Sequence, residues 1–218
     1  PDPATGEIVI TDETVQQLAQ QHLARYDKGG EMHYDVISAF IKSIRGSDPN
    51  AALYYLAVML EGGEDPKFIA RRLLILASED VGLANPNALM LAQSCFQAVT
   101  VIGMPEGDII LGQTVVYLAT SPKSNASYKA IRGARAYVRQ HGVQPVPLAL
   151  RNAPTKLMEE LGYGDQYLYS HDYEGNFAYQ EFLPQALSGT VFYHPGHNPQ
   201  EAKAQERLRQ LWGEKYGY

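Results

Sequence analysis

The sequence predicts an all-α protein, in which a helical bundle is followed by a mostly helical, aromatic-rich and irregular C-terminal extension. Asp or Asn precedes Pro at three helix starts, apolar residues recur at intervals of three and four, and no convincing alternating strand comes before residue 140. The last third differs in kind, because residues 163–218 hold 8 of the 15 tyrosines together with many turn-forming glycines and prolines.

The first two helices are delimited by polar residues and by glycine. Thr11 or Asp12 is expected to cap a helix that runs through Gln20 and Ala24. The next helix is expected to end at Gly46. Its apolar stripe is formed by Val36, Ile37, Phe40, Ile41 and Ile44.

Three further helices open with the pairs Asp48-Pro49, Asp65-Pro66 and Asn85-Pro86. The side-chain oxygen of Asp or Asn accepts hydrogen bonds from the free N–H groups of the first turn, and proline has no N–H group that needs a partner there. Apolar residues follow each pair at helical spacing: Leu53, Leu56, Ala57 and Leu60; then Ile69, Leu73, Leu76 and Ala77; then Leu89, Ala92, Phe96 and Val99.

The remaining helices follow in order along the chain. Pro105 leads into a helix that carries Ile109, Ile110, Val116 and Leu118. Ser124 or Asn125 opens a helix that reaches Gln140. Short helices are expected near residues 154–161 and 201–212, and the stretch between them is expected to be an irregular wrap pinned by aromatic side chains, with room for one hairpin.

The helix over residues 51–60 is apolar on nearly all sides. Besides its regular stripe, it carries Tyr54, Tyr55, Val58 and Met59. Such a helix lies either inside the core or at a contact with a neighbouring subunit. A place in the core is the default, and for a contact with a neighbouring subunit these four residues are the candidate oligomer interface.

Composition and charge restrict the class of protein. The 218 residues are 45% hydrophobic and 19% charged with a net charge of -6, which is typical of one large or two small globular domains. No apolar run approaches the ~18 residues that cross a bilayer, and the single cysteine, Cys95, cannot form an internal disulfide. We therefore expect a reducing, cytoplasmic location. Because the chain begins at Pro1 without an initiator Met, we also expect a piece of a longer protein.

Motifs for the common catalytic chemistries are missing from the sequence. The dipeptide Gly-Lys does not occur, so no P-loop can bind nucleotide phosphates, and G-x-S-x-G, H-E-x-x-H and C-x-x-C are absent as well. Cys95 lies on an apolar helical face, which favours a small buried residue over a nucleophile. We predict no catalytic residue and no metal site; the one cluster with the composition of a metal site is His171, Asp172, His194 and His197.

The segment 123–156 carries seven positive charges and neither Asp nor Glu. At about 100° per residue, its helical cations fall within about 120° of one face together with Tyr128. The opposite face carries Ala130, Ala134, Tyr137 and Val138. A basic stripe with an interleaved aromatic ring suits single-stranded nucleic acid, which needs phosphate neutralisation and base stacking. The candidate DNA-binding residues are Lys123, Tyr128, Lys129, Arg132, Arg135, Arg139, Arg151 and Lys156. The alternatives are a solvated face and pairing with carboxylates of a neighbouring subunit.

Several long motifs resemble one family. They are YDKGGEMHYDVISAFIKSIRGSDP over residues 26–49, SPKSNA over 121–126, VPLALRNAPTKLM over 146–158, LGYG over 161–164, HDYEGNF over 171–177 and FLP over 182–184. The chain resembles the region after the ATPase core in the replication-associated recombination protein A family of AAA+ ATPases (RarA/MgsA, or Mgs/Werner-helicase-interacting). The resemblance covers nearly the whole chain from about residue 10.

The resemblance implies a domain organisation and a context. Residues 1–28 are similar to the end of the AAA+ lid with its linker, residues 29–120 to the collar-like helical oligomerisation domain of clamp loaders, and residues 121–218 to a family-specific C-terminal extension. ATP and Mg²⁺ are then bound by an N-terminal module outside this chain, so the chain has no cofactor of its own. Family members act on DNA at stalled replication forks, in recombination and repair, assemble as tetramers and work with single-strand DNA-binding protein, which implies a nucleoid-associated location.

Two hypotheses of different classes follow. The preferred one is a non-catalytic oligomerisation and DNA-engaging module of a AAA+ ATPase; the resemblance implies that the full-length protein is a DNA-dependent ATPase. The alternative is a free-standing metal-dependent hydrolase that uses His171, Asp172, His194 and His197.

Overall fold

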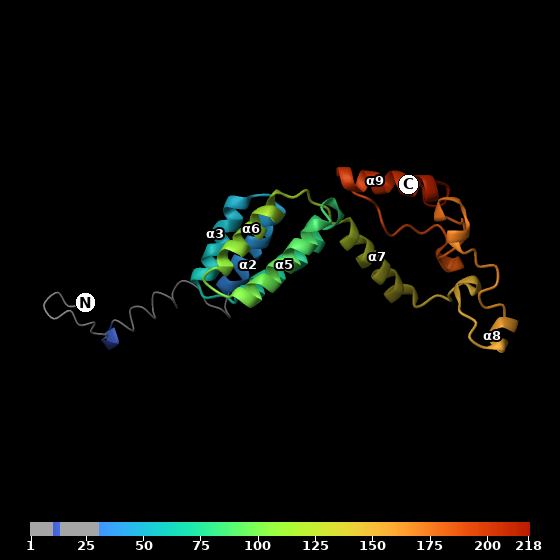
Figure 1. The fold of residues 1–218 in the computed structure, drawn as a ribbon, viewed down its shortest axis with the longest axis horizontal. Helices are drawn as coiled ribbons and strands as arrows, with labels where there is room; N and C mark the ends of the chain where they lie inside the picture. Colours follow the sequence, from blue (N-terminus) through green and yellow to red (C-terminus); the bar gives the residue numbers. More distant parts are fainter. Residues whose placement is uncertain (1–10, 14–30) are drawn as a thin grey trace. The chain divides into compact units, whose positions relative to one another are not determined.

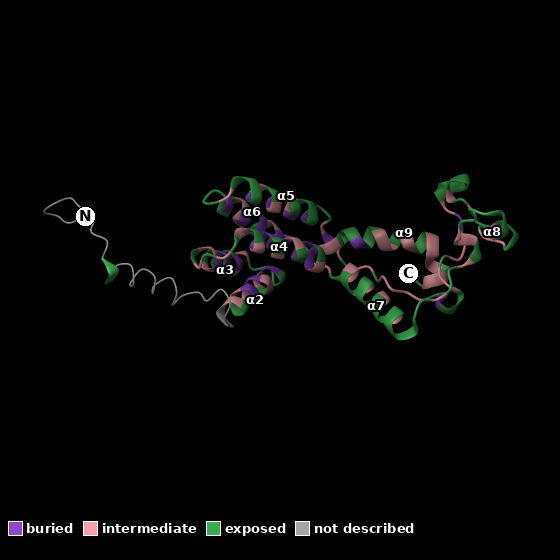
Figure 2. Cartoon of the chain, turned by 90° about the horizontal axis from the view of Figure 1, so that it is seen from below, coloured by how far each residue is buried: buried purple, intermediate pink, exposed green. Residues whose placement is uncertain are grey.

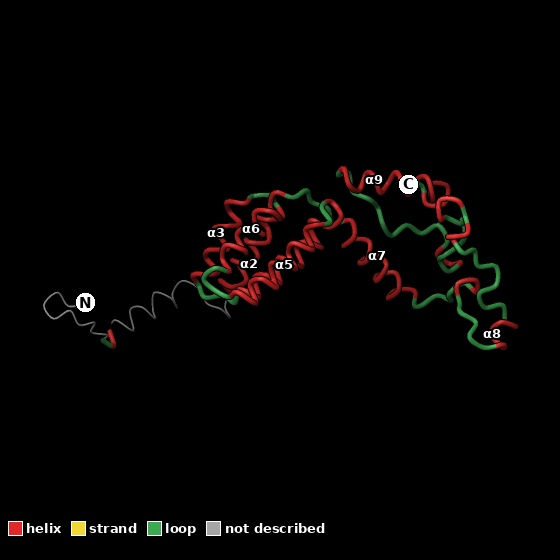
Figure 3. Tube along the Cα trace, viewed as in Figure 1, coloured by secondary structure: helices red, strands yellow, loops and turns green. Residues whose placement is uncertain are grey.

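The computed structural model describes residues 11–13 and 31–218, with side chains from residue 33 onward in the second range. Within these residues the chain forms helices joined by turns and contains no β-strand (Figure 3). The predicted all-α class is therefore confirmed. The predicted helix through Gln20 and Ala24, and nearly all of the predicted lid segment 1–28, lie outside the described residues.

The chain divides into two compact units, of which the first ends at Lys123 and the second runs from Ser124 to Tyr218. Buried residues concentrate in the helices of the first unit, while the second unit consists mainly of half-buried and exposed residues (Figure 2). None of the described helices is long and apolar enough to cross a membrane.

The first unit is a bundle of α2 (Glu31–Arg45), α3 (Pro49–Glu61), α4 (Pro66–Leu76), α5 (Asn87–Ile102) and α6 (Gly107–Thr120) (Figure 1). A π-helical turn, Ala77–Val81, and a 3₁₀ turn, Gly82–Ala84, join α4 to α5. Helix α6 is central, because it packs against each of the other four. The largest fully buried side chains of this core are Phe40, Ile44, Met59, Ile69, Leu73, Val81, Leu111, Val115 and Leu118.

The N-caps of α3 and α4 are those that the sequence predicts. The Asp48 carboxylate accepts hydrogen bonds from the backbone N–H groups of Asn50 and Ala51, and the Asp65 carboxylate accepts one from Lys67. Proline occupies the first helical position in both. The predicted third cap is wrong. Helix α5 begins at Asn87 without a side-chain cap.

Asn85 has a different role because the π and 3₁₀ turns before it place it two residues ahead of α5 in extended backbone. Its amide group donates hydrogen bonds to the Tyr117 hydroxyl at 2.9 Å and to the Ser121 hydroxyl at 3.1 Å. Asn85 therefore ties the segment before α5 to the C-terminal end of α6.

The second unit contains α7 (Ala126–His141), α8 (Lys156–Glu160) and α9 (Pro199–Tyr216). The two later helices lie where short helices were expected, although α9 is longer at both ends. Between them the chain makes 3₁₀ turns at Ser170–Asp172, Glu174–Asn176 and Gln185–Leu187, and the hairpin that the sequence left room for does not form in this described segment. Three aromatic rings pin this wrap to the indole of Trp212 on α9: Phe177, Tyr179 and Phe182.

A buried carboxylate fixes the start of α9. Glu201 is 1% exposed and accepts hydrogen bonds from the Tyr193 hydroxyl, the Asn198 amide and the Ser124 hydroxyl. A Cβ atom on Gly196 would lie 2.7 Å from this carboxylate, so a side chain at that position would displace it. Glu201 thus holds the chain before α7, the loop before α9 and the first turn of α9 together.

Candidate nucleic-acid interface

Helix α7 begins and ends at polar or glycine residues, as the sequence predicts. The Ser124 hydroxyl accepts a hydrogen bond from the N–H group of Ala126 at the first turn. At the other end Gly142 has a φ of 71° and its N–H group bonds to the carbonyl of Val138. Arg139 and His141 lie in the last turn, where positive charge interacts favourably with the helix dipole.

The two faces of α7 differ as the helical spacing predicts. Ala130, Ala134 and Tyr137 are half-buried, and the Tyr137 ring meets Phe192 edge to face at 6.1 Å. Val138, which was expected on this apolar face, is instead 49% exposed, because at about 100° per residue it lies beside Arg135. The other side is exposed and carries four cationic side chains with one tyrosine. We call these five residues the basic face: Tyr128, Lys129, Arg132, Arg135 and Arg139.

The basic face is electrostatically unpaired. Among the residues that the structure describes, none of its four cations has a carboxylate within 4.0 Å. The Arg132 guanidinium lies 5.3 Å from the centre of the Tyr128 ring, a cation–π arrangement that orients both groups. The face therefore offers free N–H donors beside an aromatic ring that is 37% exposed.

Lys123, also a candidate DNA-binding residue, has its ammonium group already bonded within the first unit. Its Nζ donates to the carbonyl groups of Ala119 and Ser121 at 2.9 and 2.6 Å and to the Ser47 hydroxyl at 3.0 Å. Burial lowers the pKa of this lysine, and the nearby charge of Asp80 acts in the opposite direction. Lys123 caps the C-terminal end of α6, so it does not extend the basic face.

Arg151 and Lys156 also stand apart from α7. The Arg151 guanidinium donates to the Val146 carbonyl at 2.8 Å and to the Tyr163 hydroxyl at 3.2 Å, and it stacks over the Tyr163 ring at 5.1 Å. This arginine is half-buried and holds two loops together. Lys156 is exposed, but it opens α8 instead of belonging to α7.

The four candidate interface residues of α3 divide between surface and core. Tyr54 is 64% exposed, Tyr55 and Val58 are half-buried, and Met59 is 0% exposed. Met59 points into the bundle, so it is a core residue and does not belong to an interface. The exposed side of α3 borders a shallow cavity of about 310 Å³ between α3 and α6, lined by Leu53, Leu56, Ala57, Leu60, Asp108, Ile109 and Gly112.

The metal-hydrolase alternative has no geometric support. No group of three or more His, Cys, Asp or Glu side chains is placed to hold a metal ion anywhere in the described ranges. The His171 ring forms a hydrogen bond with the Asn176 amide oxygen at 3.1 Å and lies near the Tyr169 ring. His194 and His197 lie exposed before α9, and the four residues do not form a metal-holding group in the described part of the chain.

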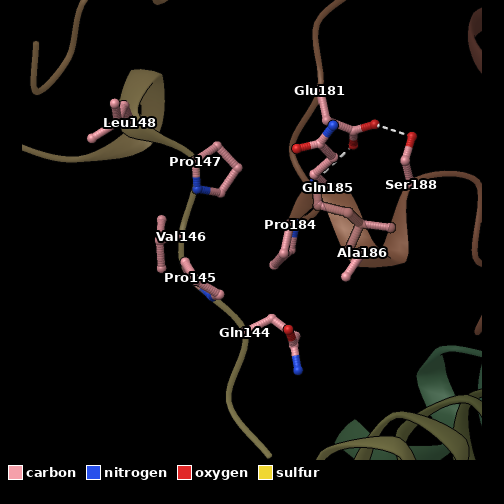
Figure 4. Close-up of a pocket in the computed structure, with 11 residues that line it drawn as sticks. Gln144, Pro145, Val146, Pro147, Leu148, Glu181, Pro184, Gln185, Ala186 and Ser188 are labelled. Atoms are coloured by element: carbon pink, nitrogen blue, oxygen red, sulfur yellow. Dashed lines mark hydrogen bonds between the residues drawn. The ribbon is translucent and has the colours of Figure 1, made fainter. Parts of the chain in front are cut away.

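A cavity of about 730 Å³ in the second unit lies between residues 144–148 and 181–188. Figure 4 shows Pro145, Val146 and Pro147 on one side and Pro184 and Ala186 on the other. Its one acidic side chain, Glu181, is already bonded to Lys215 and to the Ser188 hydroxyl. The lining is therefore largely apolar, and its one carboxylate is already engaged.

Comparison with known proteins decides the family. The sequence model described as the MgsA AAA+ ATPase C terminal matches residues 46–212, and the model described as the AAA C-terminal domain matches residues 1–45. The chain belongs to the MgsA C-terminal family. The predicted resemblance is thereby confirmed. The border between the two matches falls at the end of α2, whereas the resemblance predicted a border between residues 28 and 29.

Relatives of this MgsA-family chain are found in bacteria and in a eukaryote. Replication-associated recombination protein A of Coxiella burnetii is 46% identical over 204 residues, 93% of this chain and 46% of the relative. The protein of the same name in Escherichia coli K12 is 43% identical over 95% of this chain and 46% of the relative. ATPase WRNIP1 of Dictyostelium discoideum is 43% identical over 86% of the chain and 22% of the relative. The chain spans less than half the length of these relatives.

Proposed function

We propose that this chain is the non-catalytic C-terminal module of a AAA+ ATPase that acts in replication-fork maintenance, recombination and repair. Within that ATPase it binds DNA through the basic face of α7 and joins subunits through its helical first unit. Membership of the MgsA family supports the ATPase context, and two of its relatives are named for replication-associated recombination. ATP and Mg²⁺ then bind to an N-terminal module outside this chain, and the chain itself has no cofactor.

The observation that carries the DNA-binding role is the unpaired basic face. Seven cations and no carboxylate occur in residues 123–156 of a chain whose net charge is -6. Four of these cations lie exposed on one side of α7 beside Tyr128. The phosphates of a nucleic acid are attracted by such a local positive potential, whatever the sign of the net charge.

Self-association of the first unit rests on its exposed apolar surface. Tyr54 of α3 is 64% exposed, Ile109 of α6 is 71% exposed and Val101 of α5 is 84% exposed. Exposed apolar residues in this number favour contact with another subunit. Three further parts of the proposal rest on the family resemblance. They are assembly as a homotetramer, action together with single-strand DNA-binding protein, and a location at the nucleoid.

Charge reversal on α7 tests the DNA-binding role. We expect Arg132→Glu with Arg135→Glu to weaken binding of a fluorescently labelled single strand, as measured by fluorescence anisotropy over a series of salt concentrations. Log affinity of the original chain should fall with log salt by roughly 0.7 for each neutralised phosphate, and the variant should show a flatter slope. Sequence of the strand should not matter, because phosphate contacts carry no sequence information.

The matched control is Lys203→Glu with Arg207→Glu, which changes the net charge equally. Both residues are exposed on α9 of the same unit. If the control weakens binding as much as the α7 variant does, net charge alone accounts for the effect and the proposed site is wrong.

A further inference from the structure

The second unit carries a surface of the opposite charge. From residue 157 to residue 202 the chain contains no lysine and no arginine, although it contains seven acidic residues. Residues 165–180 form the exposed part of this stretch that also carries tyrosines, and we call them the acidic tyrosine loop. Nothing in the DNA-binding role of α7 accounts for this loop.

A single side chain closes the loop from residue 168 to residue 180, and residues 165–167 come just before this closure. The Gln180 amide donates a hydrogen bond to the Leu168 carbonyl at 2.7 Å and accepts one from the Leu168 N–H group at 3.2 Å. The turns Ser170–Asp172 and Glu174–Asn176 pack against each other inside it. A loop closed in this way presents its remaining side chains outward on a compact support.

The outward side chains are carboxylates and phenol rings. Asp165, Asp172 and Glu174 are exposed, and none of them takes part in an ion pair within the described part of the chain. Tyrosine side chains lie between and beside them with 44–55% of their surface exposed: Tyr167, Tyr169 and Tyr173.

The loop and the basic face are chemically complementary. The basic face offers four unpaired cations beside an aromatic ring, which suits a chain of negative charges interleaved with flat rings. A single strand of DNA has that chemistry, and so has the acidic tyrosine loop, with carboxylates in place of phosphates and phenol rings in place of bases. Within one protomer no ion pair joins the two surfaces in the described residues, so both are available to another molecule.

We propose that the acidic tyrosine loop of one copy of this chain binds the basic face of a second copy and that DNA displaces it. The inference rests on the proposed role of α7 in DNA binding. It adds that the acidic tyrosine loop competes with DNA for the basic face. Because the two surfaces differ, the contact joins unlike faces of the two copies. Exposed ion pairs are screened by salt, so the contact weakens as ionic strength rises.

Zero-length cross-linking of the full 218-residue chain tests the contact. A carbodiimide couples a carboxylate to a lysine amine, and Lys129 is the lysine of the basic face. We expect mass spectrometry of a mixture of ¹⁴N- and ¹⁵N-labelled chains to find mixed-isotope peptides that join Lys129 to Asp165, Asp172 or Glu174. A single-stranded oligonucleotide, or about 1 M salt, where the Debye length is ~3 Å, should suppress them. Lys129→Arg should abolish the linkage, since the charge stays but the coupling amine is lost.

Neutral variants of the loop test the competition. Asp165→Asn, Asp172→Asn and Glu174→Gln should raise the apparent affinity for a labelled single strand at high protein concentration, because basic faces become free. A rise of about threefold corresponds to two-thirds of the faces being occupied beforehand. The matched control is Glu159→Gln, Glu160→Gln and Glu214→Gln, which removes the same charge from exposed carboxylates outside the loop. An equal rise in the control would show a net-charge effect and overturn the inference.

Failure of the inference is distinguishable from failure of the proposed function. If Arg132→Glu with Arg135→Glu weakens DNA binding but no mixed-isotope linkage forms at Lys129, the loop contact is wrong and the DNA site stands. A linkage that persists with single-stranded DNA bound would also overturn the competition. If the linkage forms but charge reversal leaves DNA affinity unchanged, α7 serves self-association and the proposed DNA site is wrong.

Discussion

The charged residues of segment 123–156 differ in whether their N–H donors already have acceptors. Lys123 and Arg151 are bonded to backbone carbonyl groups and to hydroxyl groups of the protein. Arg132 and Arg135 are exposed, and no carboxylate within the described residues pairs with them. Free donors bind phosphates without first breaking a bond, so a positive charge in the sequence is by itself a poor guide to a DNA contact.

Tyr128 provides a test of base stacking at a single residue. If a base stacks on its ring, Tyr128→Ala should weaken binding of a single strand by about 1–3 kcal/mol with little change in the salt slope, because no charge is removed. Tyr128→Phe keeps the ring and should bind as the original chain does. Fluorescence anisotropy measures both, and an equal loss in the two variants would contradict stacking.

Glu201 couples the stability of the second unit to pH. Burial raises the pKa of this carboxyl, but hydrogen bonds from Ser124, Asn198, Gly196 and Tyr193 outweigh burial and lower it. A group whose pKa is lowered by folding stabilises the folded state above its ordinary value of about 4.3, and this contribution is lost as the pH falls through the lowered value. Glu181 acts in the same direction. Burial opposes its ionisation, yet bonds from Lys215 and Ser188 lower its pKa to about 2.

The variant Glu201→Gln should therefore destabilise the second unit more at neutral pH than in acid. We expect a loss of about 1.5–3 kcal/mol at pH 7, typical of a hydrogen-bonded charged group, and a smaller loss well below pH 4. Urea unfolding followed by the fluorescence of Trp212 measures it, because this residue is the single tryptophan and belongs to the second unit. Equal losses at both pH values would contradict the lowered pKa.

At the level of elements, the cap of α3 makes a separate contribution to stability. Asp48→Ala removes the acceptor for two backbone N–H groups and should cost about 1 kcal/mol, whereas Asp48→Ser keeps an acceptor and should recover most of it. The reaction of Cys95 with a thiol reagent in urea reports the first unit, since this single cysteine is 2% exposed in the core. If Asp48→Ser were as unstable as Asp48→Ala, the cap would not be the cause.

Elements governed by local sequence were predictable, and those governed by long-range contacts were not. The starts of α3 and α4 and the two faces of α7 depend on neighbours within one or two turns, so spacing and caps are sufficient. The cap predicted at Asn85 was wrong because the partners of its side chain, Tyr117 and Ser121, lie more than thirty residues away at the C-terminal end of α6. The place of Met59 was not predictable, because α3 is apolar on nearly all sides and the sequence does not show which side packs against the central helix, α6.

The same limit applies to the candidate site. The basic face could be read from the sequence because its residues share one helix. That Lys123 does not belong to the basic face could not be predicted, because its ammonium group donates a hydrogen bond to Ser47, which lies in another part of the chain. The acidic tyrosine loop was missed, although a run of 46 residues without lysine or arginine is visible in the printed sequence from residue 157 to residue 202. Its closure by Gln180 and Leu168 is visible only in the structure.

At the scale of the molecule, the two units present different kinds of surface. The first unit exposes apolar side chains on its helices, such as Tyr54 and Ile109, while the second exposes separated positive and negative surfaces. Contacts through these surfaces respond to salt in opposite ways. Screening weakens the pairing of charges, whereas salt does not weaken the burial of apolar area.

The last prediction is that the chain self-associates through its first unit. At about 100 μM, where contacts of micromolar affinity are occupied, light scattering should give a mass well above the 24.1 kDa of one chain, and most of that mass should persist in about 1 M salt. Tyr54→Glu should lower the mass, because it places a charge in the apolar contact. Tyr34→Glu is the control, since Tyr34 of α2 is 67% exposed outside α3. A strict monomer at that concentration, or an assembly lost entirely in high salt, would contradict an apolar interface on the first unit.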